Sequence, residues 1–415
     1  MVLTHQKTLT QQKAHAPRNS LGVYISVPFC RSKCTYCNFA SGVYPARDHE
    51  RYIERLTEDL TTAPRWASQI GLEFARSVDT VYLGGGTPTL LAPELIRKLF
   101  GALRAEFDLD PSAEITVECA PGQLPDATLQ ALAEAGVNRI SLGVQSFIDR
   151  EARETGRLHT RATVFDDLRR LRAAGIHNLN VDLIAGLPGQ TFASWAESLE
   201  VLVESGVAHA SVYMLEVDED SRLGREMLQG GTRYHAGLVP SDDAIARMYE
   251  STIERFARAG IEQYEISNFA RPGFRSRHNM RYWERLPYLG LGLDASSALQ
   301  TDDSVVLRSK TSDDLKAYLD RSEAPETAWL SLDRQHEEAW FLGLRLNAGV
   351  DTAALEEEFG RERVWPALDV AHHLAADGLV VFEGSCVRLS ARGRLLSNEV
   401  FQSFLGLEAD CPDRI

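Results

Sequence analysis

Short β-rich runs alternate with amphipathic helical stretches from residue 21 to about residue 260, and this alternation constrains the fold more than any other feature. Each strand and helix pair takes roughly 30 residues, which is typical of parallel strands joined by helical crossovers. The expected strands are 22–27, 78–83, 114–118, 139–143, 180–184 and 210–215. The expected helices are 50–62, 92–106, 125–135, 162–174, 191–205 and 242–259. The pattern predicts an α/β fold built on a partial (β/α)6 barrel of the TIM type, whose working residues gather where strands give way to loops.

The rest of the chain departs from this alternation. Residues 1–20 are polar and without period, so we expect a disordered extension ahead of the barrel at 21–260. Residues 261–325 are expected to connect the barrel to a C-terminal domain, and their part 264–300 is aromatic and loop-like. Residues 326–415 predict helices followed by two short strands, 379–382 and 387–389, which is the pattern of a winged helix.

Charge and cysteine content limit the classes of function. The formal net charge is -15 at pH 7, so nucleic acid is not expected as a partner, and the winged helix is interpreted as a lid or an interaction module. The 6 cysteines are too sparse for a disulfide framework. No stretch approaches the roughly 18 apolar residues of a membrane span, and the N-terminal residues lack the apolar run of a signal peptide. We therefore expect a soluble, cytoplasmic protein.

A cluster of three cysteines follows the first expected strand. Cys30, Cys34 and Cys37 lie within one short loop, and three thiolates leave one position of a four-coordinate or four-iron site open. Zinc is one interpretation, but no second cysteine pair supplies the missing ligands. A [4Fe-4S] cluster with one free iron that binds a chelating ligand fits the spacing better.

Polar residues follow the later strands at the same edge of the expected sheet. The triplet 84–86 either forms a tight turn or brings bare backbone close to a ligand. Glu118 either binds an ammonium or hydroxyl group or is a solvated charge, and Arg157 suits a carboxylate. Asp182, inside an apolar strand, is either a ligand contact or half of a buried ion pair, and we favour the ligand contact.

Several motifs together resemble a known family. The cysteine spacing, with Tyr36 directly before Cys37, resembles the signature of the radical SAM superfamily, in which S-adenosylmethionine (SAM) chelates the open iron and is cleaved to a 5′-deoxyadenosyl radical. GGGTP at 84–88, SLGVQSF at 141–147, DLIAGLPGQ at 182–190 and HNxxYW at 278–283 then follow in order. The combination is similar to the oxygen-independent coproporphyrinogen III oxidase-like family over nearly the whole chain.

This resemblance implies roles for individual residues. Cys30, Cys34 and Cys37 would bind the [4Fe-4S] cluster, and residues 326–415 would form the winged-helix-like HemN C-terminal domain. The positions that match SAM contacts of the oxidase are Tyr24, Gly85, Gly86, Thr87, Glu118, Gln145, Arg157, Asp182 and Met214.

Two branches of the family differ in chemistry. The true oxidase has a further cysteine two residues after the third, where this chain has Phe39, and the haem chaperone branch has the phenylalanine together with HNxxYW. The resemblance therefore implies haem binding and delivery of haem to respiratory haem proteins, possibly at the membrane, with an electron donor for the cluster and a possible homodimer. The oxidase reaction, decarboxylation of coproporphyrinogen III, is the alternative.

The HNxxYW motif would then contribute to haem binding through His278, Asn279, Tyr282 and Trp283. Imidazole is a common axial ligand of haem iron, and aromatic rings can flank a porphyrin. The competing interpretation is a histidine hydrogen-bonded within the protein, with Tyr282 and Trp283 packed as core.

The chain departs from the family pattern at two positions near the expected cofactor site. Ser26 stands where the family usually has histidine, and Asp294 places a carboxylate near the expected adenosyl pocket. Both departures bear on how SAM binds and leave the cluster ligands unaffected.

Overall fold

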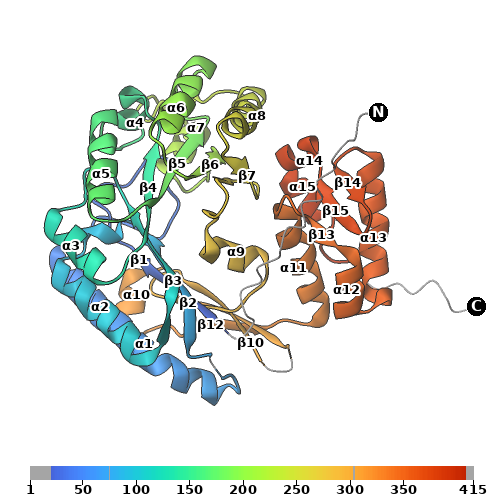
Figure 1. Cartoon of the computed structure of the whole chain (residues 1–415), viewed down its shortest axis with the longest axis horizontal. Helices are drawn as coiled ribbons and strands as arrows, with labels where there is room; N and C mark the ends of the chain where they lie inside the picture. The colour runs from blue at the N-terminus through green and yellow to red at the C-terminus, as the bar shows by residue number, and fades with distance from the viewer. Residues whose placement is uncertain (1–19, 74, 302–303, 408–415) are drawn as a thin grey trace, which may run out of the picture.

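A twelve-stranded sheet organises the computed structural model, which describes residues 20–73, 75–301 and 304–407. The predicted parallel strands are present and pair in sequence order. They are β1 (Leu21–Val27), β2 (Ser77–Gly85), β3 (Asp108–Cys119), β4 (Arg139–Gln145), β5 (Asn178–Ala185) and β6 (His209–Met214). The strands curve into an open arc with helices along its outer side, which confirms the partial barrel (Figure 1).

The predicted helices cover the outer face of this arc. They are α1 (Ala46–Gln69), α2 (Pro93–Glu106), α3 (Asp126–Glu134), α5 (Arg161–Ala173), α6 (Phe192–Glu204) and α8 (Asp242–Arg258). Each buries an apolar stripe, as α1 does with Tyr52, Leu56 and Leu60 at helical spacing. Capping boxes at Thr160 and Thr191 fix where α5 and α6 begin.

Shorter elements that the alternation did not predict connect these units. They are η1 (Pro88–Leu90), α4 (Asp149–Glu154), α7 (Arg222–Gln229) and η2 (Ala236–Leu238). In the parts of the chain that the structure describes, no helix combines the length and the apolar character needed to cross a membrane.

Residues 264–300 are not loop-like, which corrects the sequence-based expectation. They contain β8 (Asn268–Ala270), α9 (Arg277–Trp283), β9 (Tyr288–Leu291) and β10 (Ser296–Gln300), and β7 (Glu262–Gln263) precedes them. Strand β9 pairs in parallel with β1, whereas β8 pairs antiparallel with β6, so this segment extends both edges of the arc. Their brevity hid these strands, because two to five residues are too few to show a period.

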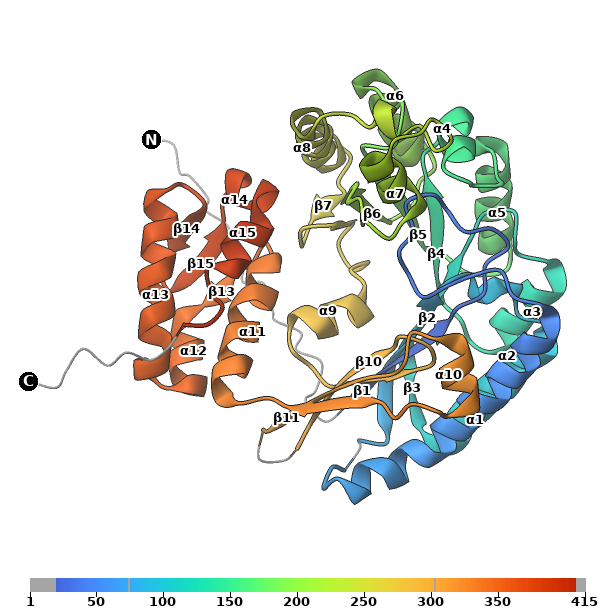
Figure 2. The same cartoon turned by 180° about the vertical axis from the view of Figure 1, so that it is seen from behind.

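The sheet continues beyond β10 through two antiparallel strands. These are β11 (Val306–Lys310) and β12 (Glu326–Trp329), with α10 (Leu315–Asp320) between them. Figure 2 shows this extension running from the barrel toward the C-terminal domain.

The C-terminal domain has its own hydrophobic core, and its predicted pattern is confirmed. Its elements are α11 (Leu332–Arg345), β13 (Val350–Asp351), α12 (Thr352–Phe359), α13 (Arg361–Ala376), β14 (Val380–Glu383), β15 (Cys386–Leu389), α14 (Ala391–Leu395) and α15 (Ser397–Gln402). The three strands form a separate sheet in the order β13-β15-β14. Trp340 stacks on Phe404 at 4.7 Å between ring centroids, inside a core that is distinct from that of the barrel.

Candidate functional site

A cavity of about 760 Å³ lies inside the open barrel and reaches the C-terminal domain. All three clustered cysteines line it. So do most of the residues predicted to contact SAM: Gly85, Gly86, Thr87, Glu118, Gln145, Arg157, Asp182 and Met214. Tyr24 is the exception, since its ring packs behind that of Tyr82, with 6.0 Å between the centroids, and Tyr82 faces the cavity in its place.

Backbone hydrogen bonds hold the cysteine loop on two sides. On one side, the amide of Cys30 donates to the carbonyl of Gly42 at 2.8 Å. On the other, the amide of Thr35 donates to the carbonyl of Thr155 at 3.1 Å, and the carbonyl of Thr35 accepts from the amide of Leu223 in α7 at 2.9 Å. Backbone contacts thus fix the loop independently of its thiols, which are free and partly exposed.

The thiol groups differ in their surroundings. Burial raises the pKa of the Cys30 thiol, and the hydroxyl of Ser41 opposes that rise. Among the described residues, no three His, Cys, Asp or Glu side chains converge on a point where one ion could bind. A mononuclear zinc site needs such convergence, whereas the thiolates of a [4Fe-4S] cluster are bonded to different irons.

The glycine turn after β2 supports the cysteine loop. The amide of Gly86 donates to the carbonyl of Val27 at 2.8 Å, and the amide of Thr87 donates to that of Phe29 at 2.7 Å. The amide of Gly85 donates to Glu118 at 3.1 Å. All three amides are therefore hydrogen-bonded within the protein. The turn brings backbone without side chains to the cavity wall, but at these positions it has no free N–H groups to donate to a ligand.

Replacing Gly86 by alanine is expected to displace the cysteine loop without removing a thiol. A Cβ at this position would lie 2.7 Å from the carbonyl oxygen of Phe29 and 2.8 Å from that of Val27, so the backbone must shift. We expect the Gly86→Ala protein to retain less than half of the iron of the wild type after anaerobic reconstitution, measured by iron analysis. Gly101→Ala is the matched control, because its Cβ would meet nothing within 4 Å, and full iron loss in that variant would contradict the argument.

Two carboxylates share the cavity. Glu118 accepts from the Tyr82 hydroxyl at 2.8 Å, and Asp182 accepts from Ser141 at 3.0 Å and from the Asn180 amide at 2.6 Å. Burial, followed by the charge of Asp182, raises the pKa of Glu118 to about 7. Burial also raises the pKa of Asp182, while its hydrogen bonds lower it. Two acidic groups held this way favour a ligand that brings positive charge or hydroxyl donors.

The pKa of Glu118 predicts a pH dependence of stability. Its carboxyl holds a proton in the folded chain over the range from about pH 4.5 to about pH 7, where the unfolded chain has lost it. The free energy of unfolding should therefore fall as pH rises through that range, by up to about 1.4 kcal/mol per pH unit from this group. Urea unfolding of the wild type and of Glu118→Gln at several pH values measures it. The variant should lose this part of the slope, and an unchanged slope would contradict the assignment.

Gln145 and Arg157 line the cavity, and each has a buried polar atom without a hydrogen-bond partner among the described residues. Gln145 is buried in a left-handed conformation, φ 70°, at the end of β4, and its Oε1 has no hydrogen-bond partner among the described residues. Strained non-glycine residues of this kind concentrate at functional sites. The Nε of Arg157 is likewise buried without a partner in the described chain. Burial opposes the charge of Arg157, but Tyr36 and Cys34 raise its pKa.

These groups fit the chemistry of SAM. The amino acid end of SAM carries a carboxylate that suits the guanidinium of Arg157, whose Nε has no partner among the described residues, and its ammonium and ribose hydroxyls suit Glu118 and Asp182. The cysteine thiols lie on the wall of the same cavity. The two departures from the family pattern do not obstruct it: Ser26 is buried beneath Gly85, and Asp294 forms an ion pair with Lys310 at 2.9 Å.

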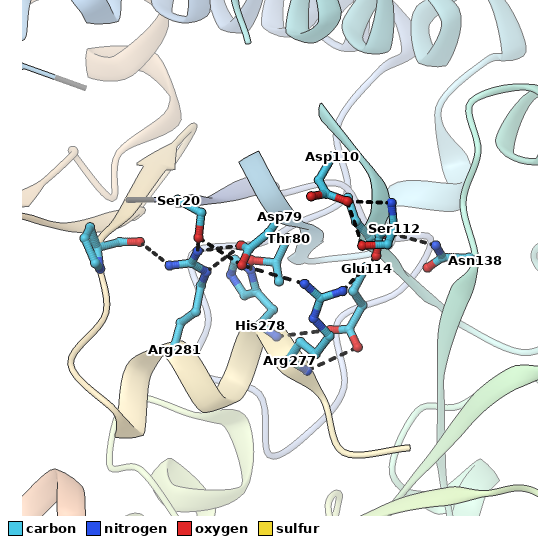
Figure 3. Close-up of polar contacts among 12 residues, drawn as sticks. Ser20, Asp79, Thr80, Asp110, Ser112, Glu114, Asn138, Arg277, His278 and Arg281 are labelled. Atoms are coloured by element: carbon cyan, nitrogen blue, oxygen red, sulfur yellow. Dashed lines mark hydrogen bonds and ion pairs between the residues drawn. The ribbon is translucent and has the colours of Figure 1, made fainter. Parts of the chain in front are cut away.

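Helix α9, which carries the HNxxYW motif, lies inside the arc (Figure 1) and is anchored by polar contacts to residues of β2 and β3 (Figure 3). Glu114 of β3 accepts from the backbone amides of Arg277 and His278 at 3.1 and 3.0 Å, at the first turn of the helix. Arg281 is 1% exposed and donates through Nε to Asp79 at 3.0 Å, and its other nitrogens reach Ser20 and the Pro287 carbonyl. A buried ion pair and a capped N-terminus therefore fix α9 in place.

His278 is fully buried, and both of its ring nitrogens have hydrogen-bond partners. Nδ1 pairs with the Thr80 hydroxyl and Nε2 with the Tyr282 hydroxyl, both at 2.9 Å. Burial, followed by the charges of Arg281 and Arg139, lowers the pKa of His278 to about 3. In this conformation neither nitrogen is available to haem iron. The assignment of an axial ligand to His278 stays a prediction, and it requires the histidine to leave these contacts.

The other three residues of the motif have separate positions. Asn279 lines the cavity. Tyr282 packs edge to face against Tyr288, with 4.7 Å between the centroids. Trp283 lies beneath the guanidinium of Arg345 in α11, 4.3 Å from its ring centroid, so it joins the barrel to the C-terminal domain. Both aromatic rings thus have packing roles, and only Asn279 faces the cavity.

Sequence reasoning missed many cavity residues, among them Tyr82, Arg139 and Arg345. Tyr82 alternates with apolar neighbours in β2, and Arg139 is a charge in a buried strand, the same signal that singled out Asp182. Arg345, at the end of α11, comes to the cavity only through the packing of the C-terminal domain, for which the sequence gives no signal.

Two family models match the chain. That of the radical SAM superfamily matches residues 24–202, and that of the HemN C-terminal domain matches residues 330–396. The solved structure of coproporphyrinogen III oxidase (HemN) from Escherichia coli, a radical SAM enzyme, is similar with a TM-score of 0.79 at 25% identity, over 94% of this chain and 91% of that one. The fold is thus that of the radical SAM class.

Proteins with similar sequences show to which branch of the family the chain belongs. The heme chaperone HemW of Lactococcus lactis is 34% identical over 92% of this chain and 96% of its own length. That of Bacillus subtilis is 34% identical over 92% and 98%, and that of Mycobacterium tuberculosis 32% over 95% and 97%. The chain therefore belongs to the HemW branch of the oxygen-independent coproporphyrinogen III oxidase-like family.

Proposed function

We propose that this protein is a radical SAM haem chaperone, which binds a [4Fe-4S] cluster, SAM and haem and passes the haem to haem-dependent respiratory enzymes. Cys30, Cys34 and Cys37 would hold the cluster. When bound, the cluster and SAM would together supply one-electron chemistry. The proposal includes a cytoplasmic location, an electron donor for the cluster and recipient haem proteins as partners.

The observation that carries the proposal is the residue two positions after the last clustered cysteine. Phe39 stands there, at the wall of the cavity with 62% of its surface exposed, where the family pattern of the oxidase has a cysteine. An apolar ring at this position cannot ligate metal, and it offers a flat contact to a porphyrin. The names of the HemW relatives agree with this interpretation.

Residues of the cavity would position SAM, hold the thiols in place and exclude water. Arg157 would orient the carboxylate of SAM, while Glu118 and Asp182 would receive its positive and hydroxyl groups. The backbone contacts of the cysteine loop would hold the thiols before the cluster binds. Residues of the C-terminal domain that line the cavity, among them Asn398 and Glu399, would exclude water from it.

The second candidate is the oxidase reaction, decarboxylation of coproporphyrinogen III propionates. The likeness to the HemN structure over nearly the full length favours it, and Phe39 speaks against it.

One experiment separates the two candidates. The reconstituted protein is incubated anaerobically with SAM, a reductant and either haem or coproporphyrinogen III. We expect haem binding at micromolar concentration, followed by absorbance, and no protoporphyrinogen. Formation of protoporphyrinogen would establish the oxidase, and absence of haem binding in both apo and reconstituted protein would reject the chaperone.

A further inference from the structure

Two arginines are buried in the barrel, and they differ completely in their partners. Arg281 is 1% exposed, and its guanidinium is matched by Asp79, Ser20 and a carbonyl. Arg139, the first residue of β4, is 2% exposed. Its Nε has no hydrogen-bond partner, and no ion pair or hydrogen bond joins its guanidinium to any described residue.

Arg139 also faces the cavity, at the opposite end of β4 from Gln145. The side chains of Ser141, Asn180 and Ser211 line the cavity near it, but they are engaged with one another: the Asn180 amide donates to Ser141 at 2.7 Å and to Ser211 at 3.1 Å. Asp182 accepts hydrogen bonds from Ser141 and Asn180; burial raises its pKa, and these hydrogen bonds and the charge of Arg139 lower it. Among the described residues, however, no hydrogen bond or ion pair joins this network to the guanidinium group of Arg139.

The histidines around Arg139 supply no counter-charge. His209 donates or accepts through both nitrogens, to Asn180 at 2.6 Å and to Tyr264 at 2.9 Å. Both ring nitrogens of His278 are hydrogen-bonded as well, to the hydroxyls of Thr80 and Tyr282. Burial lowers the pKa of both histidines, with the charge of Arg139 as a further cause, so both rings are neutral.

An unpaired buried guanidinium is costly, and a folded protein normally matches it with an acceptor. A guanidinium binds carboxylates through two parallel hydrogen bonds, a geometry that water does not reproduce. We propose that Arg139 is an anion site deep in the cavity, which receives a carboxylate of the bound porphyrin, a haem propionate. The inference rests on the proposed function, because haem is the carboxylate-bearing ligand of that proposal.

This site is separate from the one expected for SAM. Arg157 follows α4, beside the cysteine loop, whereas Arg139 lies at the amino end of β4. The two cations can therefore serve two different carboxylates in one cavity, one from SAM and one from the porphyrin.

The test compares haem with haem dimethyl ester, whose propionates carry no charge, on the full-length protein. Wild type should bind haem about tenfold to a hundredfold more tightly than the ester, as measured by absorbance titration. Arg139→Gln should bind both ligands as weakly as wild type binds the ester, and Arg139→Lys should be intermediate. SAM affinity should be unchanged. Arg258→Gln, at an exposed ion pair of α8, is the control for net charge and should behave as wild type.

The thermal unfolding of the apo protein provides a second readout. Because Arg139 pairs with nothing in the described chain, Arg139→Gln should unfold at the same temperature as wild type or higher. A lower temperature together with unchanged haem affinity would make Arg139 a structural residue and overturn the inference.

Other outcomes distinguish the possible failures. Equal affinity of wild type for haem and ester overturns the anion site and leaves the chaperone proposal standing. Weaker SAM binding in Arg139→Gln, with haem binding retained, assigns the site to the SAM carboxylate and also overturns the inference. A wild type that binds no haem rejects the proposed function itself, and the inference with it.

Discussion

Replacing any one of Cys30, Cys34 and Cys37 by serine should reduce the iron content after anaerobic reconstitution from about four atoms per chain to near background. The visible absorbance of the cluster should disappear with it. A hydroxyl is a far poorer iron ligand than a thiolate, and a loop with only three thiolates has no spare ligand to replace a lost one. Iron and sulfide analysis, with the absorbance spectrum, measures the effect.

Cys386→Ser is the matched control for this experiment. Cys386 begins β15 in the C-terminal domain and does not line the cavity, so its replacement should leave the iron content unchanged. Circular dichroism should show all four variants folded, because the cysteine loop is fixed by backbone hydrogen bonds. If the loop variants kept their iron, the cluster would have to bind elsewhere.

The second large effect is expected at Arg281. Arg281→Met removes the cation that is buried against Asp79, itself 4% exposed, and leaves this carboxylate only the Ser20 hydroxyl and the partly exposed Arg277, 3.7 Å away. Breaking a buried pair in this way costs about 3–5 kcal/mol. We expect a loss of that size in the free energy of unfolding, measured in urea, together with weakened haem binding, because Arg281 holds α9 in the arc.

Two further variants test whether the loss of stability in Arg281→Met comes from the buried charge of Asp79. Arg258→Met removes a largely exposed i,i+4 pair with Glu254 and should cost no more than about 0.5 kcal/mol. Combining Arg281→Met with Asp79→Leu removes both charges and should recover much of the stability, since the buried carboxylate that lost its close partner is then absent. A loss below about 1 kcal/mol for Arg281→Met alone would contradict the role of the Arg281–Asp79 ion pair in fixing α9.

The barrel could be predicted from the sequence because its signals are local and repeated. Each of the parallel strands is a short apolar run, and each outer helix has a stripe of the helical period, as Tyr52, Leu56 and Leu60 show in α1. The helices and strands of the C-terminal domain could be predicted for the same reason. The strands of 264–300 were not, because their pairing with β1 and β6 is set by distant residues and not by their own pattern.

In the candidate site, too, some features could be predicted from the sequence and others could not. Glu118 and Gln145 lie at the ends of β3 and β4, and their convergence on one cavity follows from a parallel sheet. Asp182, inside β5, and Arg157, in the loop after α4, reach the same cavity. The surroundings of His278 could not be foreseen. Its partners are Thr80, 198 positions away, and a tyrosine one helical turn on, and no sequence pattern shows that both ring nitrogens are already engaged.

The cavity wall is shared by two hydrophobic cores. The barrel core and the C-terminal core are separate clusters, yet Arg345, Leu395 and Asn398 of the C-terminal domain line the same cavity as the cysteine loop. A ligand in the cavity touches both, so its binding free energy is added to the unfolding of each. Occupancy should therefore couple the unfolding of the two domains. We expect the protein with bound ligand to unfold as one cooperative unit and the protein without ligand to unfold its C-terminal domain first.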